Sequence, residues 1–146
     1  MVLALLLHLM AAVVTDFRRM KISNRLIASG LIWGFVLRFI GEGSTGIVHF
    51  LVNISIPVIL LFLFFQLRVL GAGDIKLFSV VGGFVTTDRL LLVIAAAFLA
   101  GGVIGAVKLL YLKASTGSFG KGRTLIHFSL AVLIGYCIVV WGCVIG

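Results

Sequence analysis

Two isolated aspartates, Asp16 and Asp74, are the side chains of this sequence best suited to chemistry. The chain has only four acidic residues, and each of these two lies at the edge of a long apolar stretch. A carboxylate beside hydrocarbon is costly, so it needs either a partner or a function. If folding brings the two together, they cannot both ionise at close range, and one keeps its proton while the other remains a base.

A carboxylate pair of this kind can hydrolyse an amide bond. The base takes a proton from water, the water attacks the amide carbonyl, and the acid protonates the carbonyl oxygen and later the leaving amine. No nucleophilic side chain is required. The three histidines share no ligand spacing, and Cys137 and Cys143 match neither a zinc ribbon nor a redox pair, so we expect no metal site and no cofactor.

Asp74 lies in a glycine-rich segment that suits such a role. Gly71 and Gly73 let the backbone turn sharply and let a substrate strand approach with no Cβ in the way. Lys76 can tune the acid or lie among lipid headgroups. The alternative is that Asp74 serves as the N-cap of the helix that follows it, a position that aspartate favours.

Asp16 and Asn24 also have structural alternatives. Asp16 can be an interfacial carboxylate paired with Arg18 or Arg19, an ion pair of small energetic value. Asn24 either caps the helix that begins near it or orients Asp16. In the structural alternatives these side chains stabilise helix ends or pair with neighbouring charges, and they take no part in a reaction.

The composition indicates a membrane protein. Of the 146 residues, 62% are apolar and 11% are charged. This composition cannot provide a wettable surface around a soluble core, so we expect an all-α integral membrane protein with a single domain over residues 1–146. The net charge of +8 comes from short basic clusters between apolar runs, and no soluble basic face or aromatic platform for nucleic acid is present.

Six apolar runs predict a bundle of about six transmembrane helices. They cover residues 1–15, 25–40, 47–66, 77–87, 90–112 and 125–145, with a glycine-rich turn at 41–46. Most basic residues fall in segments that share a side with residues 16–24, which leaves Arg38 and Arg89 on the opposite side. By the positive-inside rule, the two aspartates face the cytoplasm and both termini face outward.

Glycines inside the predicted helices indicate close packing. Gly82 and Gly83 interrupt the fourth run, and Gly101 and Gly105 form a Gly-x-x-x-Gly pattern in the fifth. Small residues at this spacing let neighbouring helices approach closely. We expect these glycines to contact other helices instead of acting in catalysis.

Two segments resemble the motifs of the type IV prepilin peptidases. Asp16 and the residues up to Asn24 are similar to their first aspartate motif, in which an aspartate precedes Ile-Pro-Asn, although Ser23 stands where proline is usual. Residues 71–76, Gly-Ala-Gly-Asp-Ile-Lys, match their Gly-x-Gly-Asp-x-Lys motif fully. The resemblance covers nearly the whole chain and is closest to the short members that serve Flp/Tad-type pili.

The resemblance implies an aspartic endopeptidase in a prokaryotic cytoplasmic membrane, with Asp16 and Asp74 as its catalytic pair. The supporting residues are Gly71, Gly73, Lys76 and Asn24. The implied substrate is a prepilin, which has a short basic leader in the cytoplasm followed by an apolar helix. Longer members carry an insertion with paired Cys-x-x-Cys motifs and also methylate the new N-terminus. That insertion is absent here, so we expect no methyltransferase activity.

Lipid is the other expected partner. A positively charged leader is repelled by a positive rim, so the basic residues near the aspartates need a different role. We expect Arg18, Arg19, Lys121 and Arg123 to hold anionic headgroups, while the aspartates and backbone groups contact the leader.

Two functions of other classes remain open from the residues alone. Intramembrane acids also mark translocation paths, so a small proton- or ion-coupled transporter is one alternative. Against it, the sequence has no inverted repeat and both acids lie at one face. The other alternative is a non-catalytic scaffold of a pilus or secretion machine, in which the aspartates can be replaced without effect.

Overall fold

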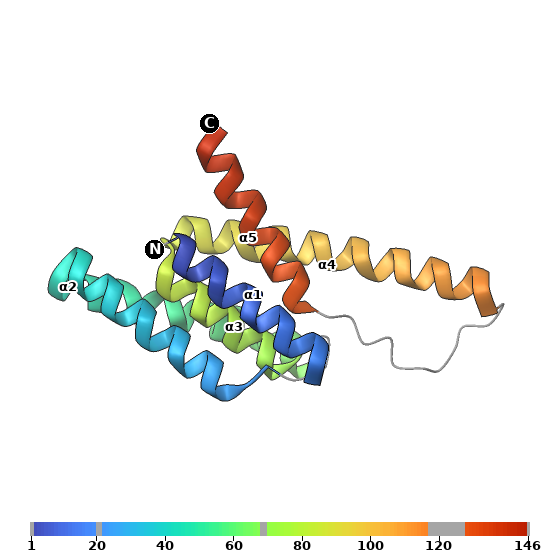
Figure 1. Ribbon diagram of the computed structural model, residues 1–146, viewed down its shortest axis with the longest axis horizontal. Helices are drawn as coiled ribbons and strands as arrows, with labels where there is room; N and C mark the ends of the chain where they lie inside the picture. The colour runs from blue at the N-terminus through green and yellow to red at the C-terminus, as the bar shows by residue number, and fades with distance from the viewer. Residues whose placement is uncertain (1, 20–21, 68–69, 117–127, 146) are drawn as a thin grey trace.

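The computed structural model describes residues 2–19, 22–67, 70–116 and 128–145, and in these ranges the protein is helical (Figure 1). The prediction of an all-α fold is confirmed. The five helices are α1 (Val2–Arg19), α2 (Asn24–Gln66), α3 (Ala72–Phe84), α4 (Thr87–Thr116) and α5 (Phe128–Ile145).

The long helix α2 is a hairpin of two arms. Gly43 breaks its helical geometry with φ 64° and ψ −141°, a left-handed conformation that glycine adopts without steric cost. The rings of Phe35 and Phe50 meet edge to face across the hairpin, with centroids 5.6 Å apart. The bend therefore falls in the predicted turn at 41–46, and the two arms correspond to the predicted runs on either side of it (Figure 1).

The short helix α3 packs between the arms of α2. All of its residues from Leu77 to Phe84 are buried. Gly82 lies directly against the Asn53 carbonyl, and a Cβ on Gly83 would come within 2.8 Å of the Phe50 ring. The prediction that these two glycines serve close packing is confirmed, and α3 is the central helix of the bundle.

Two buried polar side chains of α2 cap the C-terminal end of α3. Arg38, which is 4% exposed, donates from Nε to the Gly83 carbonyl at 3.4 Å and from Nη2 to the Val85 carbonyl. Asn53 Nδ2 also donates to the Val85 carbonyl, at 2.9 Å. The last carbonyls of a helix have no partner within it, so these side chains satisfy groups that burial would leave unpaired.

Arg38 also pairs with Glu42 at 2.8 Å, beside the bend. The guanidinium is buried inside the bundle, where it supplies donors to the end of α3. The place of Arg38 on the outer side of the membrane stays a prediction.

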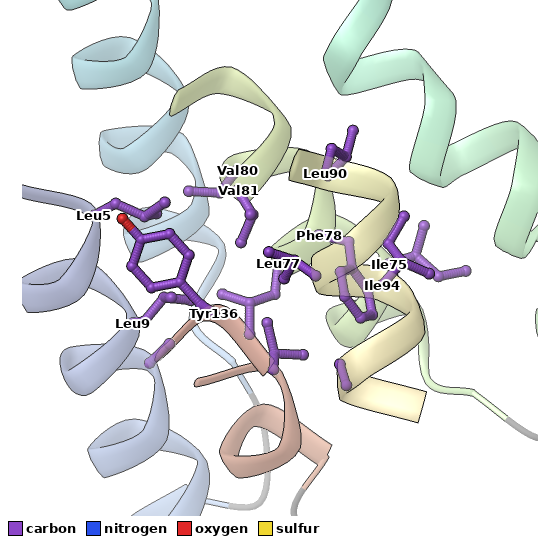
Figure 2. Close-up of a cluster of buried hydrophobic side chains, with 14 of the residues drawn as sticks. Leu5, Leu9, Ile75, Leu77, Phe78, Val80, Val81, Leu90, Ile94 and Tyr136 are labelled. Atoms are coloured by element: carbon purple, nitrogen blue, oxygen red, sulfur yellow. The ribbon is translucent and has the colours of Figure 1, made fainter. Parts of the chain in front are cut away.

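All five helices contribute to one apolar core. Figure 2 shows Leu5 and Leu9 of α1 beside Tyr136 of α5, next to side chains of α3 and α4. Within this bundle, α4 and α5 pack against each other through small residues. A Cβ on Gly101 would approach Phe128 to 2.8 Å, which agrees with the expected packing role of this glycine.

The surface of the described chain is strongly apolar. Ile40, Ile59 and Leu99 are each about three-quarters exposed, and Trp33 and Trp141 are also exposed. Contiguous apolar surface of this kind fits lipid and not water. Two of the described helical stretches, Asn24–Gln66 and Thr87–Lys108, are long and apolar enough to cross a membrane. The number of about six transmembrane helices stays a prediction.

Candidate active site

Asp16 and Asp74 come from two helices that contact each other. Asp16 is near the C-terminal end of α1, and Asp74 is in the first turn of α3, before its apolar part. Burial raises the pKa of Asp74 to about 6, the Gly71 N–H lowers it, and the charge of Asp16 adds a smaller rise. The two helices thus place both carboxylates at the same end of the bundle.

Asp74 is the third residue of α3 and not its N-cap. The N-cap is Gly71, whose N–H donates to Asp74 Oδ2 at 3.2 Å, while the Asp74 N–H donates to the Gly71 carbonyl at 3.1 Å. The N-cap alternative for Asp74 is therefore wrong. The helix begins earlier, because the carboxylate can reach back and bind the backbone of the residue before the helix.

Asp16 accepts a hydrogen bond from a residue that the sequence analysis did not select. Ser129, the second residue of α5, donates from Oγ to Asp16 Oδ2 at 2.6 Å. Its side chain is fully buried. A single serine in an apolar run far along the chain carries no sequence signal, so only the packing of α5 against α1 identifies it.

The alternative ion pair of Asp16 finds no support in the described part of the chain. The ion pairs found there join Glu42 to Arg38 and to His49. Arg18 is exposed at the end of α1. The side chain of Arg19 lies outside the described residues.

Lys76 and Asn24, two of the predicted supporting residues, contact each other. Lys76 Nζ donates to Asn24 Oδ1 at 3.2 Å. Ser23, and not Asn24, is the N-cap of α2, so the expected capping role of Asn24 is wrong. The amide oxygen instead accepts from a lysine, and this bond ties the beginning of α2 to the beginning of α3.

Gly71 and Gly73 differ in what they provide. Gly71 has an extended conformation with φ −80° and ψ 149°, which any residue adopts, so the predicted sharp turn is not the reason for glycine there. Its Cβ would stand 3.1 Å from Asp74 Oδ2, which is tighter than ordinary contact. The nearest atoms to a Cβ on Gly73 belong to Ile22, at an ordinary 3.7 Å. Gly71 therefore makes room for the carboxylate, while a Cβ on Gly73 would fit against Ile22 without crowding.

A separate hollow lies at the opposite end of α3. It has a volume of about 370 Å³ and is lined by residues that include Phe84, Val85, Arg38 and Tyr136. The Arg38 guanidinium there is occupied by Glu42 and by the carbonyls that end α3. The two aspartates do not line it, so this hollow is distinct from the candidate active site.

The comparisons with known proteins identify the family. A family model described as the type IV leader peptidase family matches residues 3–106, a range that includes both aspartates. No curated protein and no solved structure matches the chain. Because the family model covers more than half of the sequence and both predicted motifs, the resemblance is confirmed, and the chain belongs to the type IV leader peptidase family.

Proposed function

We propose that this protein is an intramembrane aspartic endopeptidase that removes the leader peptides of Flp/Tad-type prepilins at the cytoplasmic face of the membrane. Membership of a leader peptidase family supports a peptidase in general. The observation that carries the finer proposal is that the contacting helices α1 and α3 place Asp16 and the half-buried Asp74 at one end of the bundle, where the charge of Asp16 adds to the rise in the pKa of Asp74. Two carboxylates that folding brings together can hold one proton between them, which is the starting state for general acid and base catalysis.

The reaction uses both carboxylates. The ionised member takes a proton from water as the water attacks the scissile carbonyl, and the protonated member gives its proton to the carbonyl oxygen. When the C–N bond breaks, the leaving nitrogen takes a proton from the first carboxyl group. A hydroxyl of the tetrahedral intermediate then returns a proton to the second. The products are a free acid and a free amine, and the pair regains its starting state.

Orientation and partners follow from the charge distribution. The proposed site faces the cytoplasm, where the basic leader of a prepilin emerges, and both termini face outward. Arg18, which is exposed, holds an anionic headgroup in this proposal. Lys121 and Arg123, expected to do the same, lie outside the described residues. The single domain over residues 1–146 acts as a peptidase without methyltransferase activity.

Replacing either carboxylate tests the proposed function. Asp16→Asn and Asp74→Asn each remove the shared proton or the base, so we expect cleavage of a co-expressed prepilin to fall by roughly a thousandfold or more. Mass spectrometry of the pilin N-terminus gives the cleavage state and the cut position together.

Asp88→Asn is the matched control, because Asp88 is an exposed acid in the first turn of α4, at the end of α3 remote from Asp74. It should process the prepilin normally. Normal processing by either active-site variant would refute the mechanism. Proton uptake that depends on Asp74, without any proteolysis, would favour a transporter.

A further inference from the structure

The hydrogen bond from Ser129 to Asp16 makes the surroundings of the two aspartates unequal. The donor Oγ and the acceptor Oδ2 are 2.6 Å apart, although 113 positions separate the residues in sequence. This is the short distance typical of a hydroxyl that donates to an ionised carboxylate. Ser129 is completely buried and Asp16 is half-buried, so the donor hydroxyl is shielded from water.

Other serines of the protein use their hydroxyls differently. Ser29, Ser55 and Ser79 each donate to a carbonyl of their own helix, three or four residues back. This local bond is the ordinary solution for a serine inside a helix. Ser129, the second residue of α5, instead donates across to Asp16 of α1.

The surroundings of Asp74 differ from those of Asp16. It receives a single backbone N–H, from Gly71 to Oδ2, and its other oxygen can carry a proton. Burial raises the pKa of this carboxyl to about 6, well above its ordinary value of 3.8. Asp16 thus has a buried hydroxyl donor, whereas Asp74 lies where its charged form is disfavoured.

We propose that Ser129 is a positioning residue that orients Asp16 as the base of the pair, with Asp74 as its acid. This assignment rests on the proposed peptidase function. In the first step Asp16 takes a proton from the attacking water and Asp74 gives its proton to the carbonyl oxygen. In the second step the C–N bond breaks, the nitrogen receives the proton from Asp16, and an intermediate hydroxyl returns a proton to Asp74.

Among the described residues, the basic side chains at this end of the bundle are Arg18 of α1, Arg25 of α2 and Lys76 of α3, of which Lys76 is bound to Asn24. Lys108 lies further along α4, and the described part of α5 contains no charged side chain. From the described part of α5, the hydroxyl of Ser129 is the group that binds one of the two carboxylates.

The test compares the steady-state kinetics of purified variants on a prepilin substrate. In Ser129→Ala the base loses the donor that orients it, so kcat should fall about 10- to 100-fold with little change in KM. Ser129→Thr keeps a hydroxyl and should restore most of the wild-type kcat.

Ser79→Ala is the control for loss of a buried serine hydroxyl, because the Ser79 hydroxyl donates to its own helix, and its kcat and KM should match the wild type. Thermal unfolding of each variant separates stability from catalysis. An unchanged kcat in Ser129→Ala, or no recovery of kcat in Ser129→Thr, would overturn the role of Ser129. Either result, with Asp16→Asn and Asp74→Asn both inactive, would leave the peptidase function standing. Activity in either aspartate variant would overturn both proposals.

Discussion

The space around the Asp74 carboxylate explains why glycine stands at position 71. The Gly71 N–H binds Asp74 Oδ2, and the missing side chain of Gly71 leaves room for that oxygen. Any Cβ at this position would crowd the carboxylate and shift the group by a few tenths of an ångström. Reacting groups tolerate such displacement poorly, because catalysis depends on their alignment. A Cβ on Gly73 would meet only Ile22, so the expectation that Gly73 admits a substrate strand stays a prediction.

Alanine substitutions at the two glycines should therefore have different kinetic effects. Gly71→Ala displaces the carboxylate, so we expect kcat for prepilin cleavage to fall by about 10- to 100-fold with KM nearly unchanged. Gly73→Ala narrows the space for the substrate strand, so we expect mainly a higher KM. Steady-state kinetics on both variants separates the effects. Identical changes in kcat and KM for the two variants would contradict this division of roles.

At the level of helices, the position of α3 depends on its two ends. Its beginning is linked to α2 by the bond from Lys76 to Asn24, and its end is capped by Arg38 and Asn53. Between these points the helix is buried and makes close contacts through Gly82 and other small residues. Both ends therefore fix the height and rotation at which α3 presents Asp74.

Removing the cap of α3 should destabilise the protein. Arg38→Met removes the side-chain donor to the Gly83 carbonyl and one of the two donors to the Val85 carbonyl, which we expect to cost about 1–3 kcal/mol. The midpoint of thermal unfolding in detergent should fall by roughly 4 °C or more. The control is Arg89→Met, because Arg89 is exposed near the same end of the bundle and its loss should change the midpoint little. Equal midpoints for both variants would show that the cap contributes no stability.

At the scale of the whole molecule, the fold separates two chemically different ends. The end that contains Asp16 and Asp74 also carries Arg18, Arg25 and Lys76. The other end contains the α2 bend and the cap of α3. A membrane protein places its basic end toward the cytoplasm, so this asymmetry predicts which end meets the leader peptide.

Cysteine labelling tests this orientation. Cys137 and Cys143 are first replaced by alanine, and single cysteines are then introduced as Ser44→Cys at the bend and Arg18→Cys at the end of α1, both exposed positions. With a membrane-impermeant maleimide, we expect Ser44→Cys to react in right-side-out vesicles and Arg18→Cys to react only in inverted ones. The reverse pattern would place the proposed site outside the cytoplasm.

The features that depend on local sequence pattern were predictable from the residues alone. Runs of apolar residues predicted an all-α fold, the glycines at 41–46 predicted the bend of α2, and Gly82 and Gly83 predicted close helix packing. The motif at 71–76 identified Asp74 and the family. These features follow from composition and from short spacings, which neighbouring residues impose directly.

Which distant side chains contact each other depends on the tertiary structure. Ser129 binds Asp16, Lys76 binds Asn24, and Arg38 is buried at the end of α3. Each of these contacts depends on the height and rotation of one helix against another. Side-chain packing summed over the whole bundle sets these quantities, and an apolar run fits many arrangements equally well. A helix can therefore be read from its own residues, whereas its polar partners depend on the packing of all the others.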